Sequence, residues 1–132
     1  MDLQKLDKEN HLVSLFHQKN VEIDFRLPFE RDIFLFDTYV AGVMHIETFE
    51  EIEPDLQIGM ELVFIREPEN PYDSEAINIQ TQVGQKIGYV PKKDNVIFAR
   101  LMDAGKLLVG KIQDKKQKGK WTKIGIGIYL RD

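Results

Sequence analysis

The stretch MELVFIREPENPYDSEAINI, residues 60–79, decides the fold of this chain, because it places a stiff polar loop between two strands. Met60–Glu67 is rich in β-branched and aromatic residues, which favour a core strand. Ile77 and Ile79 mark a further strand, since they alternate with polar residues at a period of two. Between the strands, Pro68 and Pro71 each fix φ and hold the preceding residue extended. We therefore predict two strands joined by a rigid loop.

Further strands and one helix are predicted around this loop. Residues 33–46 are rich in Ile, Phe, Tyr and Val and are predicted to form a long strand that Gly42 bends. Lys86–Val90 is predicted to be a strand, and Asp94 is a candidate N-cap for a helix that ends at Gly105. The predicted apolar face of this helix is formed by Ile97, Phe98, Leu101 and Met102.

The C-terminal part predicts two more strands, Leu107–Gln113 and Trp121–Leu130, joined by a lysine-rich turn. One face of the second strand is expected to be buried and consists of Ile124, Ile126, Ile128 and Leu130. Short strands, many turns and one clear helix indicate a mainly β protein with one or two helices, folded as a small, partly open β-barrel. Residues 34–132 are expected to form this domain, and residues 1–33 an N-terminal extension with a helix within 2–18 and a strand at 21–26.

The composition restricts the class of protein. The chain has 132 residues, 18 Lys and Arg, 22 Asp and Glu and no cysteine, which excludes disulfide scaffolds and cysteine-based metal clusters. It has no apolar run long enough for a membrane span or a signal peptide, so we expect a cytoplasmic protein without membrane contact. Residues 61–132 hold 13 bases and 9 acids, and the lysines within 111–123 either attract a polyanion or keep a sheet edge soluble.

Motifs for catalysis are incomplete. Gly105–Lys111 matches the first seven positions of a phosphate-binding loop, but Ile112 stands where Ser or Thr must reach Mg²⁺. We therefore predict a protein without catalytic residues, bound metal or cofactor. A metal-dependent phosphoesterase that uses Glu67, Asp73 and Glu75 is the less favoured alternative, since carboxylate clusters can hold Mg²⁺.

Three motifs occur in a fixed order along the chain. They are FDTYVAGV at 36–43, LVFIREPENPYDSEAI at 62–77 and KIGYVPK at 86–92. This order resembles the HIRAN domain, which is known at the N-terminus of certain DNA translocases and as a free-standing protein in bacteria and phages. The similarity covers about residues 34–113, and residues 114–131 would form the closing strand of the domain.

The resemblance implies an OB-like β-barrel that, in the best-understood eukaryotic member, captures the 3′-hydroxyl end of single-stranded DNA. By position in the motifs, Tyr39 and Tyr72 would stack on the terminal bases. Asp73 would accept a hydrogen bond from the 3′-hydroxyl group. Since a carboxylate repels phosphate, such a contact favours a strand end that carries a free hydroxyl group.

The remaining site residues are also implied by the resemblance. Asn70 would shape the loop, Tyr89 falls where the family can place a histidine, and Lys92 would contact a backbone phosphate. Thr38 stands where the eukaryotic member has an arginine. The resemblance thus predicts a non-enzymatic module for single-stranded DNA, with a role in DNA repair. The alternative is a protein-interaction adaptor that binds an extended peptide in the same groove or at a sheet edge.

Overall fold

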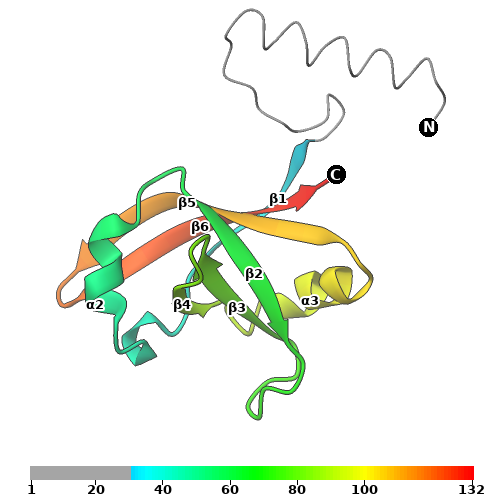
Figure 1. Cartoon of the computed structure of the whole chain (residues 1–132), viewed down its shortest axis with the longest axis horizontal. Coiled ribbons are helices and arrows are strands. Elements are labelled where there is room, and N and C mark those ends of the chain that lie inside the picture. The colour runs from blue at the N-terminus through cyan, green and yellow to red at the C-terminus, as the bar shows by residue number, and fades with distance from the viewer. Residues whose placement is uncertain (1–30) are drawn as a thin grey trace, which may run out of the picture. The chain divides into compact units, whose positions relative to one another are not determined.

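A computed structural model describes residues 31–132, which form one compact unit (Figure 1). The helix expected within residues 2–18 and the strand expected at 21–26 lie outside the described residues. The strands are β1 (Asp32–Tyr39), β2 (Glu61–Glu67), β3 (Ala76–Thr81), β4 (Lys86–Tyr89), β5 (Leu107–Lys118) and β6 (Trp121–Arg131). The helices are η1 (Val43–His45), α2 (Phe49–Ile52), η2 (Glu53–Asp55) and α3 (Asn95–Asp103). None of the helices in this described part is long and apolar enough to span a membrane.

The strands form one antiparallel sheet in the order β1-β6-β5-β2-β3-β4. The sheet curls so that the segment after β1 reaches β4, where Ala41 and Tyr89 exchange two backbone hydrogen bonds of 2.8 and 2.9 Å. This single bridge joins the two edges of the sheet at one point. The predicted small, partly open β-barrel is therefore confirmed.

Gly88 makes this closure possible. Its φ of 154° is a conformation that residues with a side chain rarely adopt. A Cβ atom at this position would collide with the carbonyl oxygen of Ala41 and the side chain of Val40. Glycine therefore lets the two segments approach closely enough for the Ala41–Tyr89 hydrogen bonds to form.

The core lies inside the barrel and follows the predicted alternation. On β6, Ile124, Ile126 and Ile128 are fully buried, and Leu130 is partly buried. Fully buried side chains on the other strands include Leu62, Ile77, Ile79, Ile87, Leu108 and Ile112. The period of two along the strands therefore identified the buried face of the sheet correctly.

The helix α3 forms where it was predicted, but two details of the prediction were wrong. Phe98 is buried, and Leu101 and Met102 pack partly buried against the core, as predicted. Ile97, however, is 69% exposed, whereas Asn95 and Ala99 are buried. Asn95, Phe98 and Ala99 are spaced i, i+3 and i+4, which places them on one face of the helix. Asp94 occupies the N-cap position, but its carboxylate accepts a hydrogen bond of 2.9 Å from the Thr38 hydroxyl and caps no backbone N–H.

The long strand predicted at residues 33–46 is shorter in the structure. β1 ends at Tyr39, and Gly42 turns the chain with a left-handed φ of 76° into η1. The acidic segment between this turn and β2 contains α2 and η2. β-propensity indicated an extended chain here, but the glycine turn allows Val43 and Phe49 to enter the core instead.

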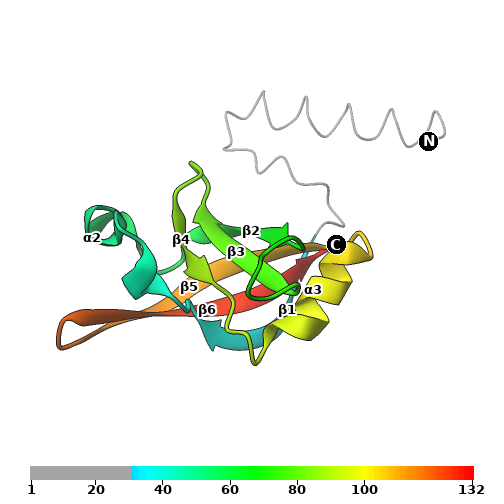
Figure 2. The same ribbon diagram turned by 90° about the horizontal axis from the view of Figure 1, so that it is seen from below.

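The lysine-rich stretch is mostly strand and not turn. The β5–β6 pairing continues to Lys118 and Trp121, so that Gly119 and Lys120 alone form the turn. Gly119 has a φ of 63°, which suits a two-residue hairpin turn. Lysine and aspartate are depleted in strands, so their frequency at residues 114–118 concealed the strand in the sequence. Figure 2 shows the resulting ribbon in orange, extending beyond the rest of the sheet.

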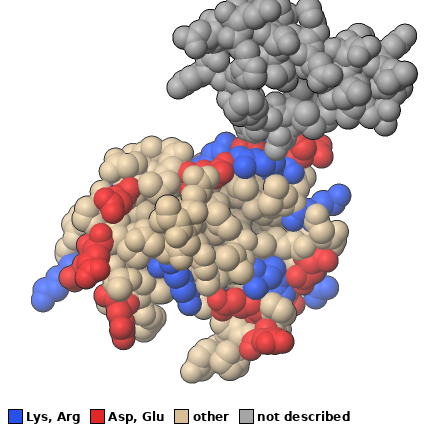
Figure 3. Space-filling view, viewed as in Figure 1, with Lys and Arg blue, Asp and Glu red and all other residues tan. Residues whose placement is uncertain are grey.

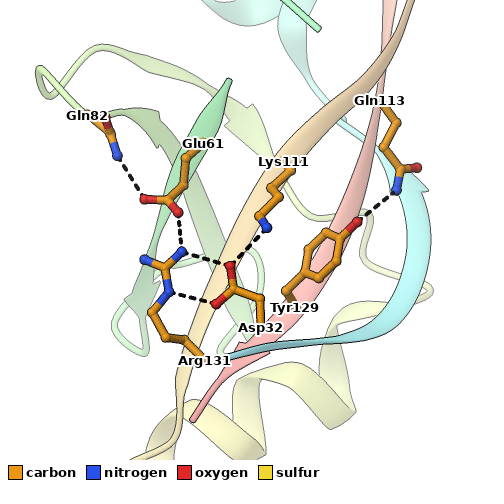
Figure 4. A network of polar contacts seen from close by, with 7 residues as sticks. All are labelled: Asp32, Glu61, Gln82, Lys111, Gln113, Tyr129 and Arg131. Atoms are coloured by element: carbon orange, nitrogen blue, oxygen red, sulfur yellow. Dashed lines mark hydrogen bonds and ion pairs between the residues drawn. The ribbon is translucent and has the colours of Figure 1, made fainter. Parts of the chain in front are cut away.

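An ionic network joins four strands at one end of the sheet (Figure 4). Arg131 on β6 donates from Nε and Nη2 to the two carboxylate oxygens of Asp32 on β1, at 2.8 and 2.9 Å, and also donates to Glu61 on β2. Lys111 on β5 lies 2.9 Å from the Asp32 carboxylate. The pKa of Asp32 lies well below its ordinary value, mainly because Arg131 donates hydrogen bonds to the charged carboxylate, although burial by itself would raise this pKa. The network thereby favours the observed register of these strands.

Candidate functional site

Arg66 holds the loop between β2 and β3, residues 68–75. Its Nε and Nη2 donate to the carboxylate of Asp103 on α3 at 2.8 and 3.1 Å. Its Nη1 and Nη2 also donate to the carbonyl oxygens of Ala76 and Ser74, at 2.7 and 3.0 Å. The planar guanidinium can make all these bonds because it offers five donors in a fixed geometry. Arg66 thus connects β2, the second leg of the loop and the end of α3.

Glu67 anchors the first leg of the loop. Its Oε1 accepts hydrogen bonds from Asn70 Nδ2 at 3.0 Å and from the Tyr89 hydroxyl at 2.8 Å. Its Oε2 accepts a bond of 2.8 Å from Asn78 Nδ2, and Lys86 Nζ donates to the Tyr89 hydroxyl at 2.6 Å. Burial disfavours the charged form, but these hydrogen bonds and the Lys86 charge keep the pKa of Glu67 below its ordinary value. The hydroxyl of Tyr89 is therefore engaged with the loop.

Asn70 and Asp73 fix the backbone at the tip of the loop. Asn70 Oδ1 accepts hydrogen bonds from the backbone N–H groups of Tyr72 and Asp73, at 2.9 and 3.2 Å. Asp73 Oδ1 accepts one from the N–H of Glu75 at 2.9 Å. Such side-chain caps replace the bonds that regular structure would supply. The side chain of Tyr72 remains 88% exposed, so the rigid loop presents this ring to solvent.

A cleft of about 520 Å³ lies beside this loop. Five of the six predicted site residues line it, namely Asn70, Tyr72, Asp73, Tyr89 and Lys92. On the other side it is lined by Ala41, Gly42 and His45 from the segment after β1. The cleft therefore lies at the barrel closure, where three segments distant in the sequence meet.

The carboxylate of Asp73 is held from two directions. Besides the bond from Glu75, its Oδ2 accepts a hydrogen bond of 2.8 Å from Asn95 Nδ2, in the first turn of α3. Asn95 is 1% exposed, and its buried Oδ1 has no hydrogen-bond partner within the described residues. A carboxylate has about four lone-pair sites, so the Asp73 oxygens can accept further bonds from a ligand.

Tyr39, the sixth predicted residue, lies next to the cleft and not in its lining. The centroid of its ring is 5.6 Å from Lys93 Nζ and 5.3 Å from Lys123 Nζ. Tyr39 is the last residue of β1, two residues before Ala41 in the cleft wall. The bond from Thr38 to the Asp94 carboxylate ties this end of β1 to the start of α3. The fold thus brings all six predicted residues into one region.

Sequence reasoning missed several residues that shape this region. Glu67 had a signal, since it lies inside the motif directly before Pro68, but its acidic neighbours suggested a metal ligand instead. Asn95 had none, because its partner Asp73 is 22 residues away. Lys93 and Lys123 approach Tyr39 only through the folding of the sheet.

The acidic residues of the loop do not converge on a common point. Glu67 accepts bonds from amide and hydroxyl groups, whereas Asp73 accepts bonds from Asn95 and the backbone. Within residues 31–132, no three His, Cys, Asp or Glu side chains are arranged to hold a metal ion. The phosphoesterase alternative therefore lacks the carboxylate arrangement on which it depended.

Some lysines of the β5–β6 hairpin are used within the fold. Lys115 Nζ donates to the carbonyl oxygens of Glu53 and Leu56, at 2.7 and 3.0 Å, and lies 2.9 Å from the Glu53 carboxylate. Lys116 Nζ lies 3.6 Å from the carboxylate of Asp114. On the face drawn in Figure 3, basic and acidic side chains are interspersed. The lysine-rich stretch is therefore not a uniform basic patch.

Comparison with known proteins identifies the family. The family model of the HIRAN domain matches residues 33–131. The chain belongs to the HIRAN family. The crystal structure of a protein from Lactobacillus plantarum matches with 25% identity and a TM-score of 0.73, over 78% of this chain and 98% of that chain. The HIRAN domain of human HLTF matches with 16% identity and a TM-score of 0.59, over 76% of this chain and 78% of that chain, which supports the fold. No curated protein matches the chain.

The family match confirms the resemblance predicted from the sequence, and with it the OB-like fold. In this HIRAN domain the three motifs meet at the cleft. The loop of the motif at 62–77 forms one wall, Tyr89 of the motif at 86–92 contributes from β4, and Ala41 and Gly42 of the motif at 36–43 contribute from the segment after β1. The roles of the individual site residues remain predictions.

Proposed function

We propose that this HIRAN domain binds single-stranded DNA and recognises its 3′-hydroxyl end in the cleft beside Tyr72. Nucleic-acid binding is supported by the family, since HIRAN is a DNA-binding module. The observation that carries the finer proposal is the Tyr72 ring, which is 88% exposed on a loop whose backbone is fixed by Asn70. A large aromatic ring exposed in this way is available for a planar ligand.

Stacking supplies affinity without a preferred sequence. A base stacked on an aromatic side chain contributes about 1–3 kcal/mol and tolerates any base, because every base has a π-face. The hydrogen bonds that Asn70 Oδ1 accepts from the N–H groups of Tyr72 and Asp73 hold this backbone in place before binding, so little conformational entropy is lost there. Tyr72 therefore binds the terminal base, and Tyr39 binds a neighbouring base.

Asp73 supplies the preference for a free hydroxyl end. Its carboxylate is aimed by Asn95 and by the N–H of Glu75, and it retains lone pairs for a hydroxyl donor. A 3′-phosphate in the same place would bring like charges together, which costs several kcal/mol. Lys92 then contacts the backbone phosphate, and Tyr89 presents its ring while its hydroxyl stays with Glu67.

The test measures fluorescence anisotropy with a 5′-labelled strand of about 10 nucleotides, within the usual range for one OB fold. The strand ends in a 3′-hydroxyl or in a 3′-phosphate group. We expect the hydroxyl form to bind about tenfold or more tightly. Tyr72→Ala should weaken binding roughly 5- to 150-fold, the equivalent of one lost stack. Ile97→Ala, on the exposed side of α3, is the control and should leave binding unchanged.

Asp73→Asn separates end recognition from loop structure. The new amide can still accept from Glu75, and the Asn95 amide can turn so that its unpaired Oδ1 accepts from the new NH₂ group. We expect the variant to keep its stability and to lose the preference for the 3′-hydroxyl end. Equal binding of both strand forms by the wild type would refute end recognition, and no binding at low salt would direct the search to peptide partners.

A further inference from the structure

The fold alone does not explain why two lysines, Lys93 and Lys123, lie beside the ring of Tyr39. Lys93 precedes α3 and Lys123 lies on β6, yet both ammonium groups lie within 6 Å of the same ring, at 5.6 and 5.3 Å from its centroid. Within residues 31–132 neither lysine forms an ion pair with a carboxylate, whereas Lys111 and Lys115 do. Two positive charges from separate elements thus flank one aromatic ring without an acidic partner.

The Tyr39 ring adjoins the cleft through two stretches of backbone. Tyr39 precedes the cleft residue Ala41 by two positions, and Lys93 directly follows the cleft residue Lys92. Adjacent Cα atoms are 3.8 Å apart, and two residues of extended chain span at most about 7 Å. A strand that leaves the cleft therefore meets Tyr39 within one short step along the surface.

A nucleic-acid base that stacks on the Tyr39 ring binds it more strongly than a lysine ammonium group does. An exposed cation–π contact is weaker than the stacking of a base on an aromatic side chain. When a base occupies the ring, the flexible lysine side chains are displaced but remain within reach of the phosphates on either side of that base. The ammonium groups then exchange a weak contact for charge-assisted hydrogen bonds to phosphate.

We propose that the nucleic-acid site continues beyond the cleft onto Tyr39, where Lys93 and Lys123 bind the phosphates that flank the stacked base. This inference rests on the proposed function and specifies the length of strand that the domain recognises. The end of the strand occupies the cleft at Asp73, and the following nucleotides cross Tyr39. A dinucleotide places its second base on Tyr39 but has a single internucleotide phosphate, so it engages only one of the two lysines, whereas a longer strand engages both.

The test compares the Lys93→Ala/Lys123→Ala variant with a Lys118→Ala/Lys120→Ala control, which removes two exposed lysines from the hairpin tip. The probes are a thymidine dinucleotide, used as a competitor, and a thymidine strand of about 10 nucleotides. Affinity for the longer strand is measured over a range of salt concentrations. The slope of log affinity against log salt is negative, and each lost phosphate contact on a single strand makes it shallower by about 0.7.

For the Lys93→Ala/Lys123→Ala variant we expect the slope with the longer strand to become shallower by about 1.4, with a smaller loss of affinity for the dinucleotide, which has one phosphate, and with the 3′-hydroxyl preference retained. The control should keep the wild-type slope. A slope equal to that of the wild type, or an equal loss of affinity for both probes, would overturn the inference. Failure of end recognition is a separate result, since it removes the 3′-hydroxyl preference of the wild type and leaves the slope comparison readable. If the wild type binds neither probe, the proposed function and this inference are both refuted.

Discussion

The substitution Gly88→Ala tests whether the barrel closure holds the site together. The added methyl group would strike the Ala41 carbonyl oxygen and the Val40 side chain, and the backbone oxygen cannot move without straining the Ala41–Tyr89 bonds. Overpacking of a tight site costs about 1–3 kcal/mol. The φ of 154° adds strain of about 1 kcal/mol for a residue with a side chain. We therefore expect a loss of roughly 2–4 kcal/mol in the free energy of unfolding.

Gly84→Ala is the matched control, because Gly84 also has a positive φ, of 88°, but no atom lies within 4 Å of its Cβ position. This control should lose only the strain of about 1 kcal/mol. Thermal unfolding measures the difference, since 1 kcal/mol shifts the Tm of a domain of this size by about 4–8 °C. Gly88→Ala should melt roughly 5–25 °C below Gly84→Ala. If both variants melt within about 3 °C of each other, the closure is not tight and the reasoning fails.

Three further predictions concern the support of the loop. Asn95→Leu removes the unpaired buried oxygen together with the bond to Asp73, so the free energy of unfolding in urea should change by less than about 1 kcal/mol. The preference for the 3′-hydroxyl strand, measured by anisotropy, should decrease. An unchanged preference would exclude a positioning role for Asn95. Arg66→Lys cannot reproduce the paired bonds to Asp103 and should cost about 1–3 kcal/mol in urea unfolding, with weaker DNA binding; full stability would contradict the role of the guanidinium. The pKa of Glu67 is lowered in the folded state, so its ionisation stabilises the fold above pH 4.5, the ordinary pKa of the group, and this contribution is lost as pH falls through the folded-state pKa. Glu67→Gln should flatten that decline in the free energy of unfolding. An identical decline in the variant would refute the role of Glu67 in the pH dependence.

Local signals determined much of the fold in advance. Alternation along β6 identified Ile124, Ile126 and Ile128 as core, because the side chains of a strand point to opposite faces. The loop of residues 68–75 was predictable because its prolines and its side-chain caps act within a few residues. The motifs also sufficed to identify the family and five of the cleft residues. Three of these residues lie in that loop, and the other two lie on β4 and just after it.

Local signals failed where a residue's environment depends on distant chain segments. Ile97 and Asn95 both fit a helix, but the packing of α3 decided that Asn95 is buried and Ile97 exposed. β-propensity extended the first strand to residue 46, whereas the turn at Gly42 and the core positions of Val43 and Phe49 ended it at Tyr39. Such outcomes depend on which surfaces meet, and a short window of sequence does not contain that information.

The sequence by itself determined the presence and order of the strands, the helix α3, the rigid loop and the family, because these depend on the spacing of residues close to one another. The tertiary structure alone decided that Ala41 closes on Tyr89 beside Gly88, that Asn95 orients Asp73, and that Lys93 and Lys123 flank Tyr39. Each of these contacts joins residues 22 or more positions apart. They form only when the curled sheet brings its edges together, since burial of the common core positions all of these segments at once.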